Sequence, residues 1–136
     1  MKIGVPTEPE GETRVAIVPT SMKKLLKAGF EVVVENGAGV AANYSDKEYT
    51  ESGATIADRG VVMKCDIIIS IRLPDISELS KGQIVACVSD PFRHPDRIKA
   101  CIDGGITLMS MDMIPRRLSR APVSYTHLTL PTTYHV

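Results

Sequence analysis

The sequence has no excess of charge of either sign. Its 16 lysine and arginine residues are balanced by 16 aspartate and glutamate residues, which gives a formal net charge of +0 at pH 7. A chain without net charge creates no long-range field that would attract nucleic acid or an anionic membrane surface. We therefore expect no nucleic-acid partner.

Long apolar runs are also missing. A run such as Ile67–Ile69 is stopped at once by Ser70, whereas a helix that spans a membrane needs about 20 apolar residues. The amino terminus does not have the form of a signal peptide, because the charged Lys2 is followed by only a few apolar residues before Pro6. We expect a chain that does not enter a bilayer by itself.

Closely paired cysteines are absent. The three cysteines, Cys65, Cys87 and Cys101, are odd in number and widely separated, unlike the paired cysteines of zinc sites and redox motifs. Each stands in or beside an apolar stretch, so we expect three reduced, buried thiols and no metal site. Reduced thiols indicate a cytoplasmic location.

Short apolar runs alternate with amphipathic stretches along the chain, a pattern typical of domains with a mainly parallel sheet. Strands are predicted at residues 2–5, 31–35, 55–57, 67–71, 83–88 and 106–111. The sequence therefore predicts one three-layer α/β domain, Rossmann-like or flavodoxin-like, with five or six mainly parallel strands and helices on both faces.

Three helices have recognisable beginnings. Thr20 or Ser21 can cap a helix that ends before residue 29. Ser45 and Glu48 have the spacing of a capping box. Pro95 opens a third helix at its first turn, and three side chains of this helix are expected to face the core: Ile98, Cys101 and Ile102.

The loop after the first strand holds a candidate substrate-binding residue, Arg14. Ligands bind at the carboxyl ends of strands in open α/β sheets, and an arginine there can hold a carboxylate or phosphate through two parallel hydrogen bonds. The alternative is a solvated arginine paired with Glu10 or Glu12, a contact that contributes little to stability.

Two other loop motifs follow predicted strands. The segment 37–39, Gly-Ala-Gly, lacks the third glycine of the dinucleotide fingerprint, so we interpret it as a turn at which two backbones pack closely. Asp90, Arg93 and His94 follow the strand at 83–88. His94 could titrate near neutral pH, although its place between two prolines favours an ordinary loop residue.

The densest charge cluster follows the last predicted strand and contains Arg116, Arg117 and Arg120. These guanidinium groups could neutralise a dinucleotide pyrophosphate or lie beside a nicotinamide carboxamide. They could equally belong to a solvated connector to a next domain, and spacing alone does not decide between the two.

Several blocks together resemble a known family. They are similar to the amino-terminal domain shared by alanine dehydrogenase and the alpha subunit of proton-translocating NAD(P) transhydrogenase, and they stand at Met1–Pro6, Glu12–Ala16, Leu26–Val32, Val34–Gly39 and Gly53–Ile56. The resemblance covers residues 1–121, and it lies in the number and order of the blocks.

Two positions distinguish the branches of this family. Alanine dehydrogenases carry a lysine in the strand that corresponds to residues 67–72 and a histidine after the next strand, where this chain has Ser70 and, nearby, Asp90. A serine cannot supply the charge or the proton transfer that amino-acid oxidation needs. The segment Met111–Arg116 resembles the transhydrogenase instead, in which an arginine after the proline contacts NAD(H), so Arg116 and Arg117 compete for that role.

The resemblance implies part of an enzyme that transfers hydride between NAD(H) and NADP(H), coupled to proton translocation. No catalytic residue is expected in this domain, because two nicotinamide rings held face to face need no acid or base. The implied NAD pocket is incomplete, with Arg116, Arg117 and Arg120 as its cofactor-binding residues, and we expect this piece to be inactive alone. NADP is expected on a partner domain.

The implied partners are the carboxyl-terminal NAD-binding domain of the same subunit, the membrane and NADP-binding subunits, and a second copy in a homodimer. These partners would hold the chain at the inner face of the membrane. Two alternatives stay open: an alanine dehydrogenase-like amino-acid oxidoreductase, and a non-catalytic binding module.

Residues 122–136 carry a separate prediction. The stretch Val123–Thr132 back-translates into a sequence that resembles the transposase-type adapter of short-read sequencing libraries. We therefore expect one domain at residues 1–121 and a disordered or artefactual tail, in which His127 and His135 are not ligands. The alternative is a threonine-rich surface segment with strand propensity.

Overall fold

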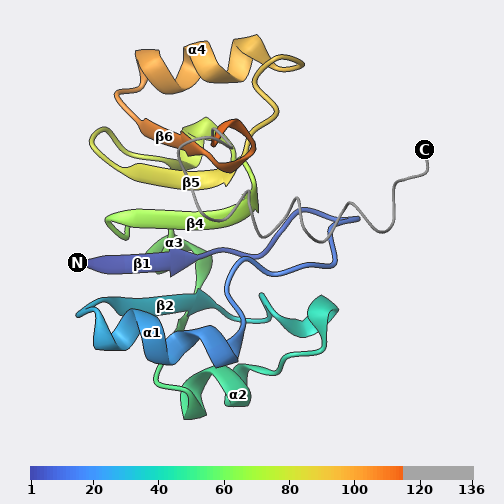
Figure 1. The fold of residues 1–136 in the computed structure, drawn as a ribbon, viewed down its shortest axis with the longest axis vertical. Helices are drawn as coiled ribbons and strands as arrows, with labels where there is room; N and C mark the ends of the chain where they lie inside the picture. The colour runs from blue at the N-terminus through green and yellow to red at the C-terminus, as the bar shows by residue number, and fades with distance from the viewer. Residues whose placement is uncertain (115–136) are drawn as a thin grey trace.

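A computed structural model describes residues 1–114 of the chain (Figure 1). Its centre is one six-stranded sheet in the order β3-β2-β1-β4-β5-β6. Every neighbouring pair is parallel, and the strands are β1 (Lys2–Val5), β2 (Glu31–Glu35), β3 (Thr55–Ala57), β4 (Ile67–Arg72), β5 (Ile84–Val88) and β6 (Thr107–Ser110). The predicted mainly parallel sheet is confirmed, and its strand order is that of the doubly wound Rossmann fold.

The direction of the chain across the sheet reverses between β1 and β4. From β1 the chain moves outward through β2 to β3, then returns to place β4 on the other side of β1 and continues to β5 and β6. Loops after β1 and β4 therefore leave in different directions and separate at the carboxyl ends of these strands. This switch point is where open α/β sheets bind ligands.

Within residues 1–114, four α-helices lie between the strands: α1 (Met22–Lys27), α2 (Asp46–Glu51), α3 (Arg59–Val62) and α4 (Pro95–Asp103). The predicted capping box is confirmed, because Ser45 Oγ accepts from the Glu48 N–H and the Glu48 carboxylate accepts from the Ser45 N–H. The predicted hydroxyl cap of α1 is wrong. Ser21 stands at that position without a side-chain hydrogen bond, since a 3₁₀ turn, η1 (Pro19–Ser21), leads directly into the helix.

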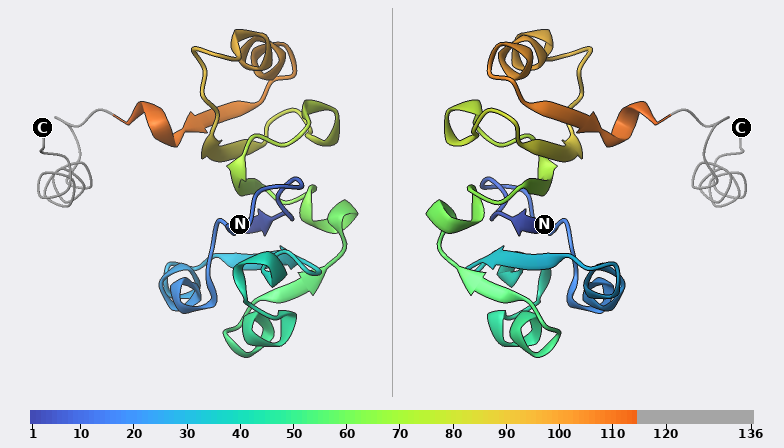
Figure 2. Two further views of the ribbon diagram at one scale, coloured as in Figure 1. Left: turned by 90° about the vertical axis from the view of Figure 1, so that its right-hand side faces the viewer. Right: turned by 90° about the vertical axis from the view of Figure 1, so that its left-hand side faces the viewer.

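The core lies on both faces of the sheet. On one face, Met22 of α1 and Tyr49 of α2 pack with Ile3, Val5, Val32 and Val34. On the other face, Val62 of α3 and Cys101 of α4 pack with Val33, Ile68, Val85 and Cys87. Figure 2 shows α1 on one side of the sheet and α3 on the other, together with the 3₁₀ turn η3 (Ile76–Glu78).

Burial tests several predictions about single residues. All three cysteines are free and buried, as predicted. Ile102 was predicted to face the core but is 71% exposed, because the short α4 turns one narrow side toward the sheet and Cys101 occupies it. The Gly37–Gly39 turn is a close-packing site: a Cβ added at Gly39 would stand 2.6 Å from the Tyr49 ring.

Residues 1–114 contain two further 3₁₀ turns, η2 (Val40–Ala42) and η4 (Met111–Met113). Within the part of the chain that the structure describes, we find no helix with the length and apolar character needed to cross a membrane. The prediction for residues 122–136 lies outside the described residues.

Candidate functional site

A cleft of about 500 Å³ opens at the switch point between β1 and β4. Its walls come from the loop after β1, the end of β2, the first residue of α3, and the end of β4 with the connection that follows it. The lining residues are Pro6, Thr7, Glu8, Pro9, Glu35, Arg59, Ser70, Arg72, Leu73, Pro74, Asp75 and Glu78. The size of the cleft suits a small organic group.

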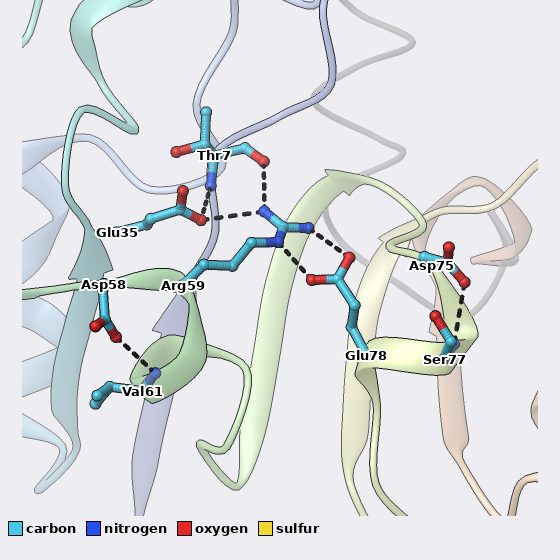
Figure 3. A network of polar contacts seen from close by, with 8 residues as sticks. All are labelled: Thr7, Glu35, Asp58, Arg59, Val61, Asp75, Ser77 and Glu78. Atoms are coloured by element: carbon cyan, nitrogen blue, oxygen red, sulfur yellow. Dashed lines mark hydrogen bonds and ion pairs between the residues drawn. The ribbon is translucent and has the colours of Figure 1, made fainter.

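Arg59 joins three elements across this cleft (Figure 3). Its guanidinium donates to both oxygens of Glu78, with N–O distances of 2.5 and 3.1 Å. It also donates to Glu35 Oε1 at 3.1 Å and to the Thr7 carbonyl at 3.4 Å. The same Glu35 oxygen accepts from the Thr7 N–H at 3.0 Å, so one arginine connects β2, the loop after β1, and η3.

Two carboxylates compensate the charge of Arg59. Its hydrogen bonds hold the pKa of the Glu78 carboxyl below the ordinary value, and the Glu78 contact raises the pKa of Arg59 itself. A ligand carboxylate at this position would have to displace Glu78 or Glu35 before it could use the guanidinium. This part of the cleft therefore favours neutral groups that donate hydrogen bonds over anions.

Glu8 is a buried carboxylate in the wall of the cleft, with 9% of its surface exposed. Its two oxygens accept from the Ile71 N–H at 2.8 Å and the Arg72 N–H at 3.0 Å, where the pairing of β4 with β5 is irregular. Burial raises the pKa of Glu8, and the two hydrogen bonds oppose this shift. Glu8 thus joins the loop after β1 to the end of β4.

Ser70 lies in the cleft wall, where the resemblance places the lysine of alanine dehydrogenases. The side chain is buried, and its Oγ donates to the Arg72 carbonyl at 2.7 Å. This hydroxyl proton is already used within the protein, and a hydroxyl carries no charge. Ser70 therefore stabilises the end of β4 and offers no acid or base to a ligand.

Arg14, predicted to bind substrate, pairs with Glu12 in this structure. Its Nε and Nη2 atoms donate to the two Glu12 oxygens at 2.7 and 3.0 Å, and its side chain is 68% exposed. The hydrogen bonds from Arg14 lower the pKa of Glu12 to about 2. Arg14 does not line the cleft, and the solvated pair with Glu12 is the arrangement observed.

A second cavity of about 490 Å³ adjoins the cleft and shares with it the residues Pro9 and 72–75. Its further lining consists of Ile76, His94 and Arg97. Of the predicted loop group, His94 is therefore in a cavity wall, whereas Arg93 lies 3.6 Å from Asp90 in an exposed ion pair. Among residues 1–114, no group of three or more histidine, cysteine, aspartate or glutamate residues could hold a metal ion.

Arg116, Arg117 and Arg120 lie outside the described residues, so the arginine cluster stays a prediction. Sequence reasoning missed Glu8, Arg59 and Glu78. Glu8 carries a local signal, because it follows the first strand at its carboxyl end. Arg59 and Glu78 carry none, since their pairing depends on the crossover between the two halves of the sheet.

Comparisons with known proteins agree on one family. Residues 4–125 match the sequence profile described as "Alanine dehydrogenase/PNT, N-terminal domain". The NAD(P) transhydrogenase subunit alpha of Cereibacter sphaeroides is 37% identical over 127 residues, which cover 89% of this chain and 24% of that subunit. An alanine dehydrogenase of Methanococcus maripaludis is 33% identical over 120 residues, covering 84% of this chain and 32% of the relative.

Solved structures agree with the sequence relatives. The transhydrogenase from Sinorhizobium meliloti superimposes with a TM-score of 0.83 at 34% sequence identity, covering 89% of this chain and 37% of that one. The chain thus spans about a quarter to a third of the length of its relatives.

Proposed function

Because the chain belongs to the alanine dehydrogenase/PNT amino-terminal domain family, we propose that it is the amino-terminal part of a transhydrogenase alpha subunit. In the whole enzyme this part contributes to hydride transfer between NAD(H) and NADP(H), coupled to proton translocation. The Cereibacter subunit and the Sinorhizobium structure, both named as transhydrogenases, support this branch of the family.

The observation that carries the proposal is the chemistry of Ser70. Its buried hydroxyl donates to the Arg72 carbonyl, and the nearby Arg59 is already paired with two carboxylates. Ser70 therefore supplies neither the charge nor the proton transfer that a lysine at this position would supply, and Arg59 offers no uncompensated cation for a carboxylate. Direct transfer between two nicotinamide rings needs neither, because correct placement of the rings supplies the catalysis.

The described residues fit the nicotinamide end of a dinucleotide. Carboxylate oxygens of Glu35 and Glu78 suit the NH₂ of a carboxamide, and the cleft volume of about 500 Å³ suits one ring. The glycine turn at 37–39 does not fit a pyrophosphate, because the Tyr49 ring fills the space beside Gly39. When bound, NAD(H) supplies the hydride chemistry, while this chain orients the ring and limits its contact with water.

The finer assignments rest on the resemblance. Arg116 or Arg117 would contact the nicotinamide, Arg120 would support it, and Arg14 would bind substrate after leaving Glu12. The adenosine and pyrophosphate sites would belong to the carboxyl-terminal domain of the subunit, and NADP to a partner domain. Membrane and NADP-binding subunits and a second alpha copy complete the proposed complex on the cytoplasmic face of the membrane.

A chimera tests the proposal. Residues 1–121, the domain predicted from the sequence, replace the matching part of the Cereibacter alpha subunit, and the chimera is combined with the other subunits of that enzyme. We expect NADPH to reduce an NAD analogue with a shifted absorbance, and we expect no alanine-dependent reduction of NAD. Alanine-dependent reduction by the chimera would favour the alanine dehydrogenase alternative and contradict the proposal.

A titration with NAD tests the alternative that the chain is a non-catalytic binding module. Since most of the dinucleotide site lies beyond this chain, the 136-residue protein alone should bind NAD weakly. Calorimetry that shows a submicromolar dissociation constant for NAD would contradict this division of the site and would favour a self-sufficient binding module.

A further inference from the structure

We infer that Arg59 is a positioning residue of the cleft, whose guanidinium holds the connection between β4 and β5 against the ends of β1 and β2. The first part of this connection, residues 73–79, forms one wall of the cleft, and Thr7 and Glu35 belong to the opposite wall. Arg59 therefore fixes the distance between two walls that no backbone hydrogen bond joins directly.

The geometry of the contacts supports this role. We call the hydrogen bonds from Arg59 to Glu78, to Glu35 and to the Thr7 carbonyl the clasp. Glu78 receives two parallel hydrogen bonds, the arrangement in which arginine is most directional. The third nitrogen holds Glu35 and the Thr7 carbonyl on the other side (Figure 3). The Arg59 and Glu78 side chains are about one-third exposed and Glu35 is largely buried, so solvent screens the network less than it screens a surface pair.

The ends of the clasp are themselves anchored. Arg59 is the first residue of α3, and Asp58 caps this helix by accepting from the Val61 N–H. Glu78 ends η3, which begins with Asp75 accepting from the Ser77 N–H. Both partners therefore project from short, capped turns, which limits the conformations over which they must be ordered.

A second set of contacts limits how far residues 73–79 can move when the clasp is lost. Leu73, Ile76 and Leu79 pack against the core on the far side of the same connection. These apolar side chains hold the base of the wall whether or not Glu78 is paired. Loss of Arg59 should therefore loosen the cleft side of residues 73–79 without unfolding the domain.

Hydrogen exchange on the full 136-residue chain tests the clasp. In Arg59→Gln and in Glu78→Gln, amide exchange in residues 73–79 should quicken by about tenfold, with exchange in α1 unchanged. Arg59→Lys keeps the charge but loses the two parallel hydrogen bonds to Glu78. Its amide exchange at residues 73–79 should therefore be faster than in the parent chain and slower than in Arg59→Gln. Glu51→Gln is the matched control, because Glu51 forms only an exposed pair with Lys47, and it should change nothing at 73–79.

Ligand binding tests whether the clasp sets the cleft, and this step rests on the proposed function. With nicotinamide mononucleotide as the probe, Arg59→Gln should bind several-fold more weakly than the parent chain, and Arg59→Lys should recover part of the affinity. If Arg59 had a purely structural role, weaker binding of the mononucleotide would be accompanied by a lower urea midpoint of the variant. This order of affinities with equal urea midpoints in the parent chain and both variants therefore indicates a positioning role.

The outcomes separate the two proposals. Unchanged exchange at 73–79 in both Arg59→Gln and Glu78→Gln overturns the positioning role. Faster exchange with equal mononucleotide affinity overturns the part that concerns the cleft. Faster exchange in the two variants, together with no binding of the mononucleotide by the parent chain, leaves the positioning role standing and counts against the proposed placement of the nicotinamide in this cleft.

Discussion

Carboxylates near the switch point differ in how the fold shifts their pKa. Glu8 and Glu12 are close in sequence, yet the pKa of Glu8 is raised and that of Glu12 is lowered to about 2. The difference arises from their partners. Backbone N–H groups compensate burial of Glu8 incompletely, whereas the Arg14 guanidinium stabilises the charged form of Glu12.

The low pKa of Glu12 predicts a loss of stability in acid. A carboxyl with a lower pKa in the folded chain stabilises the fold above its unfolded value of 4.5, and this contribution disappears as the pH falls toward about 2. Urea midpoints of the parent chain should therefore fall more steeply over this range than those of Glu12→Gln. Glu10→Gln changes an exposed carboxylate and should follow the parent; a Glu12→Gln curve parallel to the parent curve would reject the idea.

Glu8 contributes with the opposite sign. Because the pKa of Glu8 is raised in the folded chain, its contribution to the free energy of unfolding is complete below pH 4.5, the ordinary pKa of the group. This contribution is lost as the pH rises through the pKa of the folded state. The two carboxylates therefore change the stability of the fold in opposite directions as the pH rises.

A buried phenol supplies a second test for single residues. The Tyr49 side chain is fully buried and its hydroxyl donates to the Ile17 carbonyl at 2.7 Å. Tyr49→Phe removes this hydrogen bond and leaves the carbonyl unpaired, which should lower the free energy of unfolding by about 1–3 kcal/mol. Urea denaturation measures the change. Tyr44→Phe removes a half-buried phenol and should cost less, so equal costs for the two variants would contradict this explanation.

Among the elements, β1 and α3 approach each other unusually closely. A Cβ added at Gly4 would stand 2.4 Å from the Val62 carbonyl oxygen, a backbone atom that cannot move aside like the end of a side chain. Glycine in the middle of β1 therefore lets α3 pack directly on the central strand.

This approach predicts opposite results for two glycine replacements. Gly4→Ala should destabilise the domain by at least about 1–3 kcal/mol, because the core must shift to accept the methyl group. Gly60→Ala, within α3, meets no atom closer than 3.6 Å and should be neutral or stabilise by up to about 1 kcal/mol. Thermal melts of both variants measure the difference, and similar melting temperatures would show that the packing relaxes freely.

The strands were predictable because strands buried on both faces appear as continuous apolar runs. Val32–Val34 and Ile67–Ile69 are such runs, and both became central strands. The helix α3 was not predicted, since Arg59–Val62 is too short to show the helical spacing of apolar residues and contains a glycine. Its cap, Asp58, was the one local signal.

The candidate site was predictable only in part. The carboxyl end of β1 followed from the α/β pattern, and Ser70, in β4, from the resemblance. The Arg59 contacts could not be predicted, because Glu35 and Glu78 are 24 and 19 residues away from it in sequence. Only the fold brings the three side chains together.

At the scale of the whole molecule, one half of one sheet face is thinly covered. Within residues 1–114, α1 packs mainly on β2 and α2 on β3, so neither helix reaches the opposite end of the sheet. Val88 of β5 and Met109 of β6 are exposed there. Parallel strands are normally covered on both faces.

This surface predicts that the 136-residue chain self-associates. Exposed apolar patches and sheet edges favour association between copies, so the sedimentation coefficient should rise with concentration. Val88→Lys combined with Met109→Lys should shift the chain toward monomer. Val40→Lys alters another exposed valine, in η2, and should leave association unchanged. A parent chain that sediments as one monomer at high concentration would contradict the prediction.

The central place of β1 has a consequence for the order in which the protein is made. Ile3 leaves the ribosome before either of its neighbours in the sheet, and Val32, on one side, follows first. Its neighbour on the other side, Ile67, emerges only after the whole β2–β3 unit. The pairing of β1 is therefore completed only after a late segment has been made, and one edge of β1 stays unpaired in the nascent chain until then. Such distant pairing makes folding slow for a protein of this length.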